Sequence, residues 1–193
     1  QRLLGNRQQP PQVQAESIEG LHNWIETIRA FPKPVIAAVE GACAGAGFSL
    51  ALACDLIVAA RDAVFVMAYS NVGLSPDGGA TWSLMHALPR ATAMQLLLAG
   101  ERIDTGRLHQ LGVVTQVSDP SAALVDALAL AEKLNTRAPN AMASIKELAN
   151  DAVTAPLHQQ LAAERDHFVR NLHHANGGEG IQAFLDRRPA LYR

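Results

Sequence analysis

Aromatic residues are scarce in this sequence, at 5% of 193 residues, although hydrophobic residues of all kinds reach 49%. A core built from such a chain has to be aliphatic and rich in alanine. No apolar run is long enough to cross a bilayer without charges, so we expect no membrane partner. The 16 basic and 18 acidic residues form no basic block, so we also expect no nucleic-acid partner.

Cysteine is nearly absent. Cys43 and Cys54 both lie in apolar surroundings, which argues against a disulfide framework and predicts reduced core residues of a cytoplasmic protein. The 7 histidines form no H-E-x-x-H motif. His173 and His174 are adjacent, and neighbouring residues on a helix point in different directions. We therefore expect no metal site.

Two phosphate-binding motifs are missing from the most informative stretch, residues 33–79. No lysine follows Gly47, as G-x-x-x-x-G-K-[ST] requires, and Leu50 stands where G-x-G-x-x-G has its third glycine. A turn of small residues, G-A-C-A-G-A-G, is present instead at 41–47. The flanking patterns predict a buried strand before this turn, and a buried helix and a second strand after it. Together these elements would form a βαβ unit.

The turn at 41–47 has two possible uses. It leaves backbone N–H groups bare at a helix N-terminus, where they would attract a phosphate or an oxyanion formed during a reaction. Alternatively, the small residues only allow a helix to pack closely on a sheet. The residues alone leave both explanations open.

The rest of the chain divides into a mixed part and a helical part. Residues 1–14 are polar and predict a loop, and apolar residues at helical spacing predict a helix over 15–30. Further strands are expected at 63–67 and 113–117, with helices at 79–88, 91–99 and 105–111. Prolines at 120, 139 and 156 predict helices over 120–136, 139–152 and 156–173. The Gly177-Gly178 pair predicts a break before a last helix at 179–188.

Three segments of the sequence resemble the enoyl-CoA hydratase/isomerase (crotonase) superfamily. They are K-P-V-I-A-A-V-E-G at 33–41, A-G-A-G-F-S-L-A-L-A-C-D at 44–55 and G-L-S-P-D-G-G at 73–79, with a weaker family-like tail at 179–185. The resemblance implies an α/β fold, a crotonase-like spiral of ββα units. Residues 1–118 would form the core and residues 119–193 a C-terminal helical trimerisation region.

The resemblance also implies partners. We expect an acyl-CoA thioester as substrate, with coenzyme A as part of it and no other cofactor. We expect a homotrimer or a dimer of trimers. The family's first oxyanion loop has no counterpart in these residues, so we expect it, with the strands before it, to precede Gln1.

Family members hold the thioester oxygen with two backbone N–H groups, and the second maps onto Ala46. Gly45 and Gly47 flank it and would line the substrate site. Hydratases of the family use two glutamates, but Ser49 and Tyr69 stand at those positions. Neither side chain can replace a carboxylate as a base near neutral pH, which argues against hydration. We expect both residues to contact substrate instead.

Asp77, in S-P-D-G-G, matches the single acid of some isomerases of the family. One carboxylate can take a proton from one carbon and return it to another. The alternative is that Asp77 only caps the next helix. Phe184 falls where relatives place an aromatic residue near the CoA nucleotide, whereas Phe65 and Trp82 are predicted to be core residues.

These observations predict an acyl-CoA enzyme that stabilises a thioester enolate. We expect it to shift a double bond, or to isomerise a ring-derived acyl-CoA, through Asp77. Two alternatives stay open at this point. One is hydration of a 2-enoyl-CoA, and the other is a CoA-thioester binder without catalytic activity.

Overall fold

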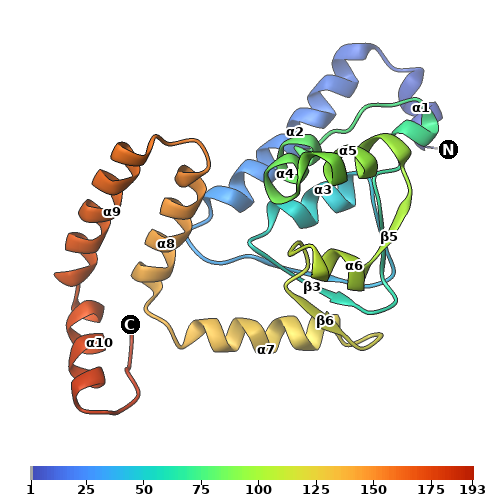
Figure 1. The fold of residues 1–193 in the computed structure, drawn as a ribbon. Helices are drawn as coiled ribbons and strands as arrows, with labels where there is room; N and C mark the ends of the chain where they lie inside the picture. Colours follow the sequence, from blue (N-terminus) through green and yellow to red (C-terminus); the bar gives the residue numbers. More distant parts are fainter. Residues whose placement is uncertain (1) are drawn as a thin grey trace.

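The structure, a computed structural model, describes residues 2–193 (Figure 1). It contains two three-stranded sheets. The first is entirely parallel and contains, in spatial order, β1 (Ile36–Val39), β3 (Leu56–Ala60) and β6 (Gln116–Ser118). The second contains β2 (Ala42–Ala44) parallel to β4 (Val64–Val66), which pairs antiparallel with β5 (Arg102–Asp104).

The predicted βαβ unit is present. Strand β1 pairs in parallel with β3, with Ile36 opposite Leu56, and α3 (Ala46–Ala53) lies between them in sequence. The prediction that 41–47 is only a turn is wrong, because the middle of this segment forms β2. Its Ala-Cys-Ala sequence carries little strand preference of its own. The backbone pairing of Cys43 with Phe65 on β4 explains the strand instead.

The predicted loop over residues 1–14 is wrong for most of residues 2–14, and Gln1 lies outside the described residues. The structure has α1 (Arg2–Arg7) and α2 (Pro11–Ala30), with Pro11 in the first turn, where its missing N–H costs nothing. The later part of α2 agrees with the predicted apolar face. That face contains Ile18, Leu21, Ile25 and Ile28, all partly buried.

The connections after β4 carry the short 3-10 helix η1 (Ser70–Val72) and three helices. These are α4 (Ala80–Ala87), α5 (Arg90–Ala99) and α6 (Thr105–Gln110). The short strand β5 follows α5 directly and was not predicted. It adds an antiparallel edge to the second sheet.

The C-terminal part is helical, as predicted. It contains α7 (Ala123–Asn135), α8 (Pro139–Ala152), α9 (Leu157–Leu172) and α10 (Ala175–Leu185). Helix α7 lies beside β1 and β3, whereas α9 and α10 extend away from the sheets (Figure 1). The predicted break at Gly177-Gly178 is wrong, because both residues lie inside α10. A Cβ atom at Gly177 would lie 2.2 Å from the Asn171 carbonyl oxygen, so glycine serves close packing here.

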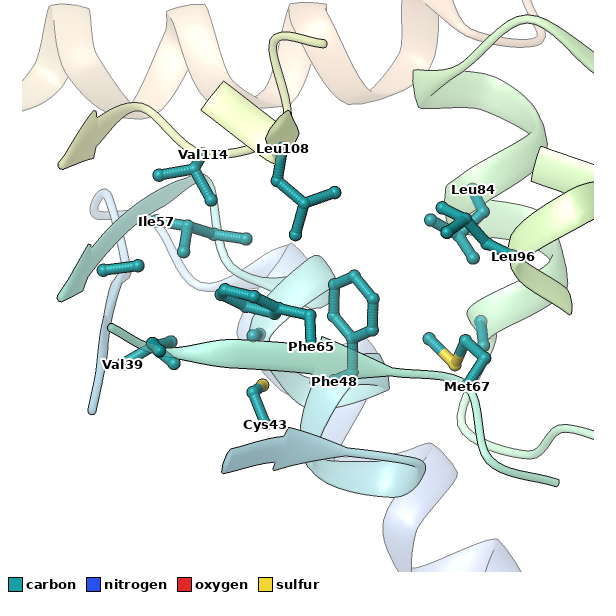
Figure 2. Close-up of a cluster of buried hydrophobic side chains, with 14 of the residues drawn as sticks. Val39, Cys43, Phe48, Ile57, Phe65, Met67, Leu84, Leu96, Leu108 and Val114 are labelled. Carbon is teal, nitrogen blue, oxygen red and sulfur yellow. The ribbon is translucent and has the colours of Figure 1, made fainter. Parts of the chain in front are cut away.

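A cluster of buried aliphatic and aromatic side chains lies between the sheets and helices (Figure 2). Phe48 of α3 packs on Phe65 of β4 with ring centroids 5.0 Å apart, and both rings are fully buried. Phe65 is therefore a core residue, as predicted. Trp82 is 39% exposed, so its assignment to the core is wrong.

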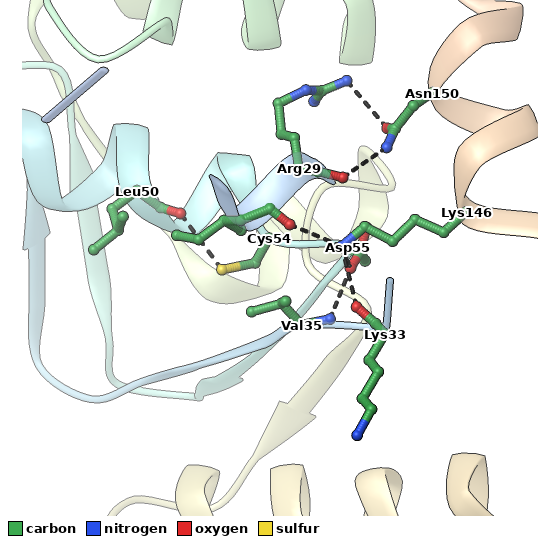
Figure 3. Close-up of polar contacts among 9 residues, drawn as sticks. Arg29, Lys33, Val35, Leu50, Cys54, Asp55, Lys146 and Asn150 are labelled. Atoms are coloured by element: carbon green, nitrogen blue, oxygen red, sulfur yellow. Dashed lines mark hydrogen bonds and ion pairs between the residues drawn. The ribbon is translucent and has the colours of Figure 1, made fainter. Parts of the chain in front are cut away.

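A buried lysine ties the C-terminal helices to the core (Figure 3). Lys146 of α8 reaches the Asp55 carboxylate at 2.7 Å and the carbonyl oxygens of Ile28 at 2.8 Å and Lys33 at 3.2 Å. Its side chain is only 8% exposed. The ammonium group therefore joins three chain segments, namely the end of α2, the start of β1 and the start of β3.

Two further properties concern residues 2–193 only. None of the helices in this range is both long and apolar enough to cross a membrane. The same residues contain no group of three or more histidine, cysteine, aspartate or glutamate side chains arranged to hold a metal ion.

Candidate functional site

The turn before α3 leaves the backbone N–H of Ala46 free as a donor. Gly45 has a φ of 52°, a conformation that favours glycine, and its N–H donates to the Val66 carbonyl at 3.0 Å. Ala46 is the first residue of α3, so its N–H has no partner within the helix. No other part of residues 2–193 accepts a hydrogen bond from it. Ala46 and Gly47 are exposed, so this N–H is available to a ligand.

Ser49 connects this turn to the loop that carries Asp77. It is completely buried, and its hydroxyl donates to the Asp77 carbonyl at 3.0 Å. The same oxygen lies 3.4 Å from the Gly45 carbonyl. Ser49 is therefore a structural link beneath the site, and the prediction that it contacts substrate is not supported by this geometry.

Gly78 lets the Asp77 loop approach α2 and α3 closely. Its φ is +62°, and a Cβ atom there would lie 3.0 Å from the Ser49 side chain, 3.1 Å from that of Ile25 and 3.2 Å from that of Leu21. Such distances leave no room for a methyl group without movement. The close packing of Gly78 on these side chains thus restricts where Asp77 can lie relative to the Ala46 turn.

The Asp77 carboxylate accepts a short hydrogen bond, 2.5 Å, from the Tyr69 hydroxyl. It does not cap the next helix, because the N-cap of α4 is Gly79 and no side chain donates or accepts there. The capping alternative is therefore wrong. Burial, with the bond to Asp77 as a smaller cause, raises the pKa of Tyr69 to about 12.

The site residues predicted from the sequence are thus partly assembled. Gly45, Ala46, Ser49, Tyr69 and Asp77 come together at the N-terminal end of α3. Phe184 does not join them, because it is 83% exposed on α10, which lies well away from α3 (Figure 1). Its contact with the CoA nucleotide stays a prediction.

A hollow of about 590 Å³ lies between α8 and the ends of α2, α3 and α4. It contains neither Ala46 nor Asp77. Its wall carries Trp82, whose ring lies 4.4 Å below the Arg29 guanidinium and 4.2 Å from the His86 ring. The i, i+4 spacing of Trp82 and His86 could have indicated their stacking, but no sequence signal connects Arg29 to them.

Comparison with known proteins identifies the class to which this fold and site belong. The family described as Enoyl-CoA hydratase/isomerase matches residues 3–193. The 1,2-epoxyphenylacetyl-CoA isomerase of Escherichia coli K12 is 41% identical over 173 residues, covering 89% of this chain and 66% of that relative. The 2,3-dehydroadipyl-CoA hydratase of the same organism is 35% identical, covering 83% and 63%.

A solved structure is more similar still. The enoyl-CoA hydratase from Polaromonas sp. JS666 is 67% identical, with a TM-score of 0.98, and the match covers all of this chain and 75% of that one. The chain therefore belongs to the enoyl-CoA hydratase/isomerase family. It spans just under two thirds of the length of the curated relatives it matches.

Proposed function

We propose that this protein is an acyl-CoA isomerase that uses Asp77 as its single proton shuttle. The observation that carries the proposal is the arrangement around α3. A carboxylate is held through Tyr69 and Ser49 against the turn that presents the free Ala46 N–H. An oxyanion donor and one base beside it are what an enolate-forming proton shift requires.

The reaction transfers one proton and changes no oxidation state. Asp77 takes a proton from the α or γ carbon of the acyl group, and the electron pair moves onto the thioester oxygen. The Ala46 N–H would stabilise that oxyanion together with the family's first donor; one such donor contributes about 3 kcal/mol. Asp77 then returns the proton to the other carbon. Coenzyme A enters as part of the substrate, and no other cofactor is needed.

Solvent exchange tests this proposal directly. In D₂O, a non-conjugated enoyl-CoA should become its conjugated isomer, and the γ carbon should gain deuterium only to the extent that the Asp77 carboxyl exchanges with solvent before it returns the proton. Ultraviolet absorbance follows the conjugation and mass spectrometry follows the deuterium. Tight CoA-thioester binding with neither change would overturn the proposal in favour of a binding protein without activity.

Hydration is the second candidate, because the enoyl-CoA hydratase from Polaromonas sp. JS666 is 67% identical to this chain. The positions of the family's two glutamates argue against it. These two positions are occupied by Ser49, which is buried, and by Tyr69. The pKa of the Tyr69 phenol is raised to about 12, so the phenol stays protonated at neutral pH and does not act as a base.

We therefore expect slow hydration of a simple 2-enoyl-CoA such as crotonyl-CoA. The turnover should lie well below the tens to hundreds per second, as an order of magnitude, of a dedicated enzyme. Loss of the enoyl absorbance measures the rate, and the isomerisation assay on the same preparation serves as the control. Hydration at tens per second would favour the second candidate over isomerisation.

We also propose a trimer or a dimer of trimers. The support is a set of large apolar side chains on α7, α9 and α10 that are more than half exposed, which is unusual for a monomer. They are Leu124, Val125, Leu128, Leu157, Leu161, Phe168, Ile181, Phe184 and Leu185. Light scattering should give three or six times the chain mass of 20.6 kDa. A stable particle of single-chain mass would contradict the expectation.

We also propose that the protein is located in the cytoplasm. Cys43 is buried, Cys54 is partly buried, and both are free thiols. Free cysteines are typical of reducing compartments, which supports a place in the cytoplasm, where the acyl-CoA partner would be met.

A further inference from the structure

The phenol of Tyr69 lies between the two parts of the candidate site. Its hydroxyl donates to Asp77 Oδ1 at 2.5 Å. Its ring faces Gly45, where an added Cβ atom would lie 3.5 Å from Tyr69 Cζ. Tyr69 thus contacts both the proposed base and the turn that presents the Ala46 N–H.

The direction of this hydrogen bond follows from the chemistry of the two groups. Burial is the larger cause that raises the pKa of Tyr69 to about 12, and the bond to Asp77 adds to it. The phenol therefore keeps its proton at any physiological pH. A phenol that keeps its proton is a hydrogen-bond donor, so Tyr69 donates and Asp77 accepts.

The two carboxylate oxygens are consequently different. Tyr69 occupies Oδ1, and no other group within residues 5–193 donates a hydrogen bond to this carboxylate. The terminal torsion of an aspartate is broad, so an unanchored carboxylate would sample many orientations. With one oxygen anchored, the plane of the carboxylate is defined and Oδ2 is left without a donor.

We propose that Tyr69 is a positioning residue that anchors Oδ1 of Asp77 and so presents Oδ2 to the acyl carbons. The inference rests on the proposed isomerase function. In each cycle Oδ2 takes the proton as the electron pair of the C–H bond enters the enolate, and then returns that proton to the other carbon. Tyr69 keeps its own proton and stays bonded to Oδ1 throughout.

Removing the hydroxyl while keeping the ring separates positioning from packing. Tyr69→Phe should lower kcat for isomerisation about tenfold, because a base held in a less defined orientation reaches the reactive geometry less often. KM should change by less than about twofold, because the ring still covers Gly45. Tyr192→Phe is the matched control, since Tyr192 lies against Gly180 in the C-terminal part, and it should leave both constants unchanged.

A spectroscopic test examines the hydrogen bond without any turnover. The chain has 2 tyrosines, so Tyr192→Phe leaves Tyr69 as the only phenol that titrates. In that background, ultraviolet absorbance is recorded within milliseconds of a jump to high pH, before the protein unfolds. Adding Asp77→Asn should lower the apparent pKa of Tyr69 by about one unit, because the phenolate would no longer form beside a negative charge.

The outcomes distinguish this inference from the proposed function. If Tyr69→Phe keeps full kcat while Asp77→Asn is inactive, the isomerase proposal stands and the positioning role is overturned. A raised KM with unchanged kcat also overturns it, because Tyr69 would then be a binding group. If Asp77→Asn retains full activity, the proposed function itself fails. An unchanged Tyr69 titration in Asp77→Asn overturns the inference even if no substrate has been found.

Discussion

Replacing Asp77 with asparagine should lower the isomerisation rate by about 100-fold or more while leaving the fold intact. General acid–base catalysis by one positioned group contributes on the order of 10²–10⁴-fold, and in the proposed reaction Asp77 is both the acid and the base. The amide oxygen of asparagine can still accept the Tyr69 hydrogen bond. The variant therefore removes the base without removing the contact that holds the loop.

A matched control variant for Asp77→Asn is available. Asp62→Asn makes the same chemical change on the exposed turn between β3 and β4, and it should leave the rate unchanged. Stability is compared by urea unfolding, where the Asp77 and Asp62 variants should lie within about 1 kcal/mol of the parent. Full activity in Asp77→Asn, or equal losses in both variants, would show that Asp77 is not the shuttle.

Replacing Lys146 with methionine should lower the free energy of unfolding by about 3 kcal/mol. Breaking one side of a buried ion pair costs on the order of 3–5 kcal/mol, because the remaining charge loses its partner. The lower end applies here for two reasons. The Asp55 side chain is 25% exposed, and it keeps a 2.7 Å hydrogen bond from the Val35 N–H. The carbonyls of Ile28 and Lys33 also lose their donor.

The region of the protein that Lys146→Met destabilises can also be measured. Hydrogen exchange in Lys146→Met should rise most in α8 and at the end of α2, where Arg29 and Asn150 form the other polar contacts of this junction (Figure 3). Lys133→Met, on the exposed side of α7, is the matched control and should cost less than about 0.5 kcal/mol. Equal stability of the two variants would mean that apolar packing alone holds α8 in place.

The elements that the sequence predicts well are those whose local pattern and tertiary environment agree. Strands β1 and β3 are short apolar runs, and the apolar face of α2 follows helical spacing, so their positions were predictable. Strand β2 was not, because pairing with β4 overrides its weak preference. Gly177 reads as a helix breaker, yet contact with the Asn171 carbonyl requires glycine at that point of α10.

The candidate site was predictable residue by residue but not as an arrangement. The resemblance placed Ala46, Tyr69 and Asp77 at matching positions of the family pattern. It could not reveal that Tyr69 bonds to Asp77, since that contact depends on how η1 and the following loop fold back. The capping interpretation of Asp77 failed for a related reason, because α4 begins three residues later, at Ala80.

The burial of Ser49 has a consequence for how such enzymes could diverge. Its side chain is fully enclosed, its hydroxyl donates to the Asp77 carbonyl, and a Cβ atom added at Gly78 would lie only 3.0 Å from it. A glutamate at position 49 would have to occupy space filled by that loop and bring a second carboxylate beside the first. Residue 49 and the loop through Gly79 are therefore coupled, and a glutamate at position 49 would require the loop to change as well.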